Sequence, residues 1–147
     1  MKAVFGAMAV VVLGAAALAQ EGTKAPQMVS FTELKWTELP ERKGMQFALL
    51  SGDPRTGPYT QMRKVPAGTD NPPHAHSSTI TNVVISGVWY TGASAASARD
   101  FGPGSVVTMP ADWPHVSGCR PGSECLLYQD GKDRFDFKPL TEKSPAR

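Results

Sequence analysis

The sequence predicts an all-β domain, a sandwich or barrel of antiparallel strands. Strand-like stretches recur at intervals of roughly 8–12 residues, and turn signals rich in Gly and Pro separate them. Helical periodicity is almost absent. Residues 31–39 fit either a first strand or a short turn of helix, because their apolar positions do not settle the period. The other predicted strands are residues 45–52, 59–65, 80–90 (broken at Ser86-Gly87), 105–109, 116–119, 124–129 and, after a turn at Asp130-Gly131, 133–138.

The first nineteen residues have the pattern of a secretory signal peptide. Lys2 gives a positive start, residues 3–18 are apolar or small, and Ala17-Leu18-Ala19 is an A-x-A cleavage signature. A membrane anchor is the alternative, but this run is rich in Ala and Gly and short for a span of ~20 strongly apolar residues. We therefore expect a periplasmic or secreted protein without a stable membrane anchor after cleavage.

The remaining chain has the length of one domain. We expect a flexible lead-in over residues 20–30, a single β-domain over 31–140 and a disordered tail over 141–147. The net charge of +2 and the lack of any basic run give no electrostatic basis for nucleic-acid binding. A small molecule or another protein is the expected partner.

The chain has two cysteines, Cys119 and Cys125, on either side of a Pro121-Gly122 turn signal. If the flanking strands form a hairpin, the two thiols lie opposite each other and a disulfide would form in an oxidising compartment. The alternative is a second metal site made by two cysteines, although no spare histidine is available to complete it.

All three histidines lie in two strand-like stretches. His74 and His76 are one residue apart, so on a strand both imidazoles lie on the same face. The third, His115, belongs to the second stretch. Neutral imidazole is a good ligand for Zn, Fe, Cu and Ni. The pattern predicts one metal site formed by His74, His76 and His115.

The first histidine stretch resembles the first signature motif of the cupin superfamily, a group of small jelly-roll β-barrels. That motif is Gly, five residues, His-x-His, three or four residues, Glu, six residues, Gly. Gly68, His74, His76, Ile80 and Gly87 match this spacing throughout.

The second stretch resembles the second cupin motif, which is Gly, five residues, Pro-x-Gly, two residues, His, three residues, Asn. Gly104, Pro110, Asp112, His115 and Cys119 match its spacing. The resemblance covers residues 59–129 and is nearest to small, exported, single-domain cupins. It implies a cupin-type jelly roll and, by the habit of the family, a homodimer.

Three positions depart from the cupin pattern. Ile80 stands where the family places a metal-binding Glu, Asp112 replaces a Gly, and Cys119 replaces the Asn. Cupins that lack the Glu often hold metal with three histidines. The resemblance therefore implies a three-His site for a divalent transition metal (Fe, Mn, Zn or Ni), with open positions for water, dioxygen or a chelating substrate.

Five further residues are pocket candidates. If the strand after His76 is regular, Asn82 shares its face, and hairpin pairing across Cys119 and Cys125 places Gln129 opposite His115. Both are candidates for orienting a ligand or the metal-binding side chains. Tyr59, Gln61 and Tyr128 are proposed as additional pocket or rim residues.

Two functions fit these features. The first is a metalloenzyme, of dioxygenase, lyase or isomerase type; Fe(II) is disfavoured outside the cell because it oxidises readily, whereas Mn, Ni or Zn avoid that problem. The second is a non-catalytic periplasmic protein that binds a small ligand or the metal. The sequence offers no clear general base, because Asp112 is the only carboxylate expected near the site.

Overall fold

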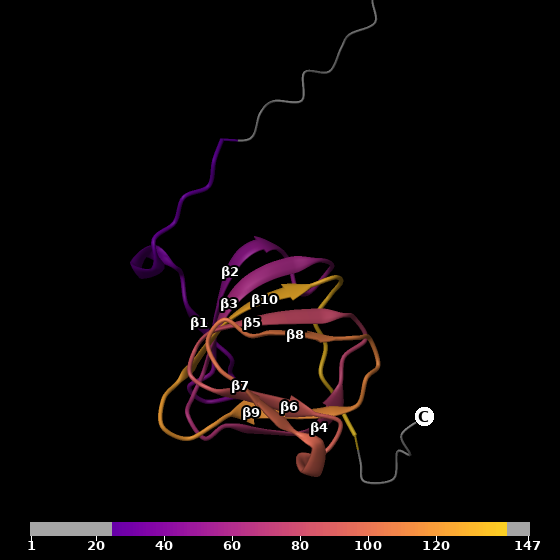
Figure 1. Ribbon diagram of the computed structural model, residues 1–147. Coiled ribbons are helices and arrows are strands. Elements are labelled where there is room, and N and C mark those ends of the chain that lie inside the picture. Colours follow the sequence, from indigo (N-terminus) through magenta and orange to yellow (C-terminus); the bar gives the residue numbers. More distant parts are fainter. Residues whose placement is uncertain (1–24, 141–147) are drawn as a thin grey trace, which may run out of the picture.

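The computed structural model describes residues 25–140 of the chain. These residues form two antiparallel β-sheets that face each other, which confirms the predicted all-β fold (Figure 1). The predicted signal peptide over 1–19, the start of the lead-in over 20–24 and the predicted tail over 141–147 lie outside the described residues. Within 25–140, no helix is long and apolar enough to cross a bilayer.

The first sheet has the strand order β1-β2-β3-β10-β5-β8, and the second has the order β11-β4-β9-β6-β7. From β3 to β6 and from β7 to β11, successive strands therefore alternate between the sheets, as in a jelly roll, whereas β1 to β3 are consecutive in the first sheet and β6 and β7 in the second. There are two single-turn 3-10 helices: η1 (Phe31–Glu33) precedes β1, and η2 (Ala95–Ser97) connects β6 and β7. The strands of the first sheet are β1 (Thr37–Glu38), β2 (Gln46–Gly52), β3 (Tyr59–Val65), β5 (Ile80–Ser86), β8 (Val106–Met109) and β10 (Cys125–Gly131). Those of the second are β4 (Asp70–Ala75), β6 (Trp89–Gly92), β7 (Arg99–Phe101), β9 (His115–Cys119) and β11 (Lys138–Pro139).

Alternation of side chains along the strands separates the interior from the surface. On β10, every second residue from Cys125 to Gly131 is buried, and the residues between them are more exposed. β3 is buried at Tyr59, Gln61 and Val65, which share one face. The interior lies between the two sheets.

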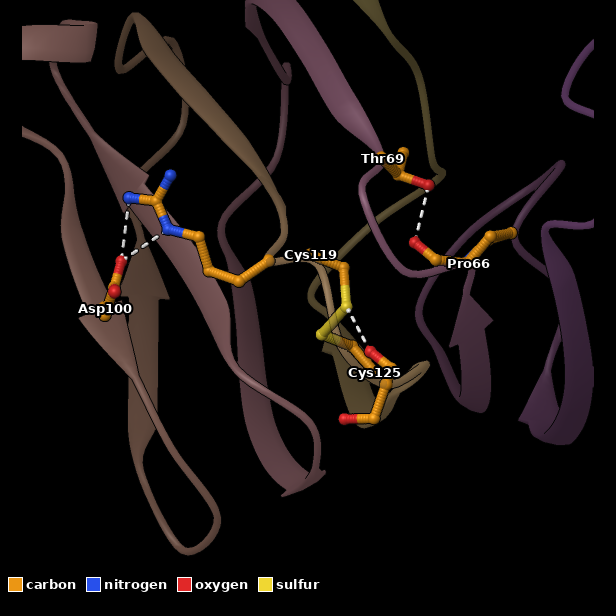
Figure 2. The surroundings of a disulfide bond; sticks show 7 residues. Pro66, Thr69, Asp100, Cys119 and Cys125 are labelled. Atoms are coloured by element: carbon orange, nitrogen blue, oxygen red, sulfur yellow. Dashed lines mark hydrogen bonds and ion pairs between the residues drawn. A yellow bond between two sulfur atoms is a disulfide. The ribbon is translucent and has the colours of Figure 1, made fainter.

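The disulfide joins the two sheets, which differs from the hairpin predicted around it. Cys119 ends β9 in the second sheet, whereas Cys125 begins β10 in the first, and the two strands do not pair. Their Cα atoms are 5.8 Å apart, so the predicted Cys119–Cys125 pair is confirmed although its hairpin is wrong. Figure 2 shows this bridge beside the turn that is closed by the Thr69 hydroxyl donating to the Pro66 carbonyl. A Pro-Gly turn reverses the chain but does not determine which sheet it enters next.

The C-terminal part of the domain also differs from the prediction. Asp130 and Gly131 do not form a turn, because β10 continues through them and pairs with both β3 and β5. The strand predicted over 133–138 is wrong as well: after β10 the chain crosses from one sheet to the other, and only the two-residue β11 pairs, with β4 (Figure 1). Residues 31–39, for which the sequence fits either a strand or a short turn of helix, contain both η1 and β1.

Candidate metal centre

The three histidines converge between the sheets. His74 on β4 is opposite His115 on β9 in the ladder, and His76 follows directly after β4. β4 has a register shift between Asn71 and His74, at the two prolines that cannot donate to a ladder. All three imidazoles are buried. One ring nitrogen from each lies within 4.8 Å of one from each of the others.

Backbone carbonyls fix the orientation of every ring. Nδ1 of His74 lies 2.7 Å from the Pro72 carbonyl oxygen, and Nδ1 of His115 lies 2.9 Å from that of Trp113. Nδ1 of His76 bonds the Asp136 carbonyl. Because a carbonyl only accepts, each Nδ1 carries the proton and each Nε2 keeps a free lone pair. This is the tautomer that a metal site requires.

The histidines are held in their neutral form. Burial, with a smaller contribution from neighbouring histidines, lowers the pKa of His74 to about 3 and that of His76 to about 4. Burial also lowers the pKa of His115. A neutral imidazole binds metal without first losing a proton. Within residues 25–140, His115 Nε2 is buried with no hydrogen-bond partner, so a donor atom remains unused at the centre of the cluster. The residues present therefore fit a divalent transition metal.

Aromatic rings pack around the three imidazoles. The Phe137 ring stacks on His74 with centroids 4.2 Å apart, and the Trp113 ring stacks on His115 at 5.2 Å. Phe135 lies 5.2 Å from His76. Phe135 and Phe137 come from the segment that crosses between the sheets. That segment is tied to the histidine loop by Asp136, whose carboxylate accepts from the Ser77 amide and hydroxyl.

Four of the five predicted pocket residues form one hydrogen-bonded network beside the histidines. Gln129 is its centre: its Oε1 accepts from Gln61 Nε2 at 2.8 Å and from the Tyr59 hydroxyl at 3.1 Å, and its Nε2 donates to Asn82 Oδ1 at 3.0 Å. All four side chains are buried. Gly131 makes room for the Tyr59 ring, since a Cβ there would lie 2.2 Å from it. Burial raises the pKa of Tyr59 to about 12, so its hydroxyl remains a donor.

The strand arrangements from which Asn82 and Gln129 were predicted to face the site are wrong, although both residues line the cavity. The chain leaves β4 after Ala75 and enters β5 in the other sheet, so no regular strand joins His76 to Asn82. Gln129 pairs with Gln61 and Asn82 and not with His115. The prediction that Tyr128 is a pocket residue is wrong: it lies on the outer face of β10, between two buried positions.

The three departures from the cupin motifs have physical accounts. Ile80, in place of the family's Glu, is buried and packs with Val107 and Met109. Asp112 has a φ of 59°, the left-handed conformation that a Gly adopts without strain at this position of the motif. Its carboxylate is exposed and pairs with Lys138. Cys119 is part of the disulfide.

The histidines open into a cavity of about 310 Å³ whose charged lining was not predicted. Glu41 and Arg42, from the β1–β2 connection, and Arg63, on β3, all line it. The expectation that Asp112 is the only carboxylate near the site is therefore wrong. Arg63 could have been found, because alternation along 59–65 places it on the face of Tyr59 and Gln61. Glu41 and Arg42 lie in a loop, where no periodicity in the sequence indicates the direction of a side chain. The full lining is Leu39, Glu41, Arg42, Arg63, Asn71, His74, His76, Asn82, Trp89, Met109, His115, Ser117, Gln129, Phe135 and Phe137.

Two facing sheets around a buried histidine cluster define a cupin, and the comparisons with known proteins give the family. The family described as the ChrR cupin-like domain matches residues 24–131, which is more than half of the 147 residues. The chain belongs to this cupin family. No curated protein sequence matches it.

Solved structures share the fold at low sequence identity. An RmlC-like cupin protein from Ralstonia eutropha is 20% identical, with a TM-score of 0.65 over 82% of this chain and 76% of that one. The polyketide cyclase RemF from Streptomyces resistomycificus is 21% identical, with a TM-score of 0.64 over 80% and 89%. A structure of Rhodobacter sphaeroides SigE in complex with the anti-sigma ChrR is 18% identical, with a TM-score of 0.56 over 70% and 52%. These likenesses show the fold alone.

Proposed function

We propose that this protein is an exported cupin that binds one divalent transition metal through His74, His76 and His115 and acts on a small molecule as a metalloenzyme. The observation that carries the proposal is the set of three neutral, buried imidazoles, each with Nδ1 bonded to a carbonyl and Nε2 free. Fe, Mn, Zn and Ni all accept such ligands. When bound, a metal of this kind supplies Lewis acidity or a site for redox chemistry.

The surrounding residues have separate tasks in this proposal. Asn82 presents its amide nitrogen to a ligand, because its carbonyl oxygen is occupied by Gln129. Phe135 and Phe137 exclude water from one side of the imidazoles. Glu41 is the only carboxylate that lines the cavity among the described residues, so it is the candidate general base or acid.

Catalysis is preferred over simple ligand binding because the cavity holds both a metal-binding set and a titratable carboxylate. A metal-assisted lyase or isomerase reaction would use both. The alternative is non-catalytic capture of a small ligand or of the metal, which needs the histidines and not Glu41. A Glu41→Gln variant separates them: in an enzyme it lowers turnover, whereas in a binding protein it leaves ligand affinity unchanged.

Export is part of the proposal and rests on the N-terminal sequence pattern. The Cys119–Cys125 pair supports it, since disulfides persist in oxidising compartments.

Elemental analysis of the protein, purified from the periplasm without chelator and without a His tag, tests the metal site. We expect about one equivalent of a transition metal in the wild type and loss of most of it in His76→Ala. Tyr128→Phe, an outward-facing change on β10, is the matched control and should retain the metal. Wild-type protein that binds no metal, even after reconstitution with Zn, Mn, Ni and Fe(II), would overturn the proposal.

A further inference from the structure

The cavity beside the histidines has a cationic wall. Arg63 points inward from β3, and Arg42 reaches in from the β1–β2 connection. Both side chains line the same cavity as the three imidazoles.

Neutral groups hold both guanidiniums. Arg63 Nη2 lies 3.0 Å from Met45 Sδ, and its Cζ is 5.8 Å from the Phe135 ring centroid. Arg42 donates to Asn71 Oδ1, and its Cζ is 4.3 Å from the Phe137 centroid. These contacts fix the planes of the guanidiniums but use few of their five N–H donors.

No carboxylate compensates either charge within the described residues. The ion pairs there join Arg55 to Asp53, Arg120 to Asp100, Lys132 to Asp130 and Lys138 to Asp112. Glu41 lines the same cavity but lies beyond ion-pairing distance of both guanidiniums. Burial lowers the pKa of Arg63, and the nearby charge of Arg42 lowers it further. Both arginines are partly buried. An unpaired cation that is partly removed from water costs free energy, so an anion in the cavity would relieve that cost.

The lining also has an unpaired hydrogen-bond donor, besides the unpaired acceptor His115 Nε2. Within residues 25–140, Trp89 Nε1 is buried without a hydrogen-bond acceptor, and Trp89 lines this cavity. A carboxylate is an acceptor-only group that two guanidinium forks bind well. A divalent metal on three neutral histidines would add positive charge on the same side.

A second cavity of about 230 Å³ adjoins the first at Arg63. It shares Leu39, Arg63 and Phe135 with the first cavity, and Phe47 and Pro54 add to its largely apolar lining. Arg63 and Phe135 therefore lie between a cavity that contains the histidines and an adjoining, largely apolar one.

We propose that this cavity binds a small organic acid, with its carboxylate on Arg63 and Arg42 and its apolar body against Phe135. The part of the ligand that faces the histidines rests on the proposed metal function. The contact between carboxylate and guanidinium does not, and it holds in the metal-free protein.

The test uses two probes of nearly equal size: salicylate, which carries a carboxylate, and salicylamide, its neutral counterpart. Binding to the metal-free and zinc-loaded protein is measured by calorimetry. We expect salicylate to bind more tightly than salicylamide in both forms. Arg63→Met should weaken salicylate binding roughly 10- to 100-fold and leave salicylamide unchanged. Arg63→Lys should fall between, because it keeps the charge and loses the planar fork.

Arg120→Met is the matched control, since Arg120 pairs with Asp100 outside the cavity, and it should bind salicylate as the wild type does. Far-UV circular dichroism and thermal unfolding establish that each variant is folded. Equal affinity for the two probes, no saturable salicylate binding at millimolar concentration, or unchanged salicylate binding in folded Arg63→Met would each overturn the proposal. If the protein binds no metal but the carboxylate preference persists, the metal function fails and the anion site stands.

Discussion

The two ends of the barrel interior are made by the same strands and have opposite character. At the disulfide end, β10 contributes Cys125 and Leu127, and β3 contributes Val65. At the histidine end, the same strands contribute Gln129 and, with Gln61 and Tyr59, most of the hydrogen-bonded network. On β9, Cys119 lies at one end and His115 at the other. Each strand thus changes from apolar to polar along its buried face.

This difference separates stability from function. The disulfide end buries apolar side chains and has the bridge between the sheets, so it stabilises the fold. The histidine end keeps an unpaired ring nitrogen on His115, neutral buried imidazoles and an open cavity, all of which cost stability in the absence of a ligand. Changes at the first end should alter stability and spare metal binding, and changes at the second should alter binding first.

The largest effect is expected from Leu127→Ala, which removes a fully buried side chain from the apolar end. Truncations of this kind lower the free energy of unfolding by about 2–5 kcal/mol. Urea denaturation measures the change, and the folded variant should retain its metal. Tyr128→Phe, one residue away on the outer face, should stay within about 0.5 kcal/mol of the wild type. Metal loss in folded Leu127→Ala would contradict the separation of the two ends.

Removal of the disulfide should have the next largest effect. Cys119 and Cys125 close a short loop between the sheets, and the entropy of such a loop corresponds to about 2 kcal/mol. The double variant Cys119→Ala/Cys125→Ala should therefore unfold at lower urea concentration than the wild type while binding one metal. If the double variant lost the metal, the cysteines would belong to the site, as in the alternative of a second cysteine-based metal centre.

Acid should also destabilise the metal-free protein, through the histidine end. An unfolded histidine has a pKa near ~6.5, whereas His74 and His76 in the fold have pKa values of about 3 and about 4. Between these values the unfolded state binds more protons than the folded state. The free energy of unfolding therefore decreases as the pH is lowered, by up to about 1.4 kcal/mol per pH unit for each histidine. Denaturation at pH 7.5, 6 and 5 measures this. His76→Ala should show a shallower slope, and a flat profile in the wild type would contradict the burial of neutral imidazoles.

The strands and the metal triad could be predicted because they depend on local patterns. Alternation and turn residues locate β3, β5 and β10 closely, and the spacing of His74, His76 and His115 fits two known motifs. Alternation also explains why Asn82 and Gln129 face the interior even though their predicted pairings are wrong. The face of the sheet to which a side chain points is set by its position along its own strand, and it does not depend on which strand lies next to it.

The rest depends on how the chain moves between the two sheets, which local patterns do not specify. The turn after Cys119 was predicted as a hairpin, but it leads into the opposite sheet. Phe135 and Phe137 alternate as in a strand and do share the cavity, yet they cross between sheets without pairing. Glu41 and Arg42 come from a loop, where no periodicity indicates direction.

X-ray absorption spectroscopy of the zinc-loaded protein tests the three-His site most directly. The account predicts a nitrogen shell at ~2.0–2.1 Å with the multiple-scattering pattern of three imidazoles and no sulfur shell near ~2.3 Å. In His76→Ala the imidazole contribution should fall or the metal should be lost. A sulfur shell, or an imidazole signal unchanged in His76→Ala, would show that the metal binds elsewhere and would contradict the account.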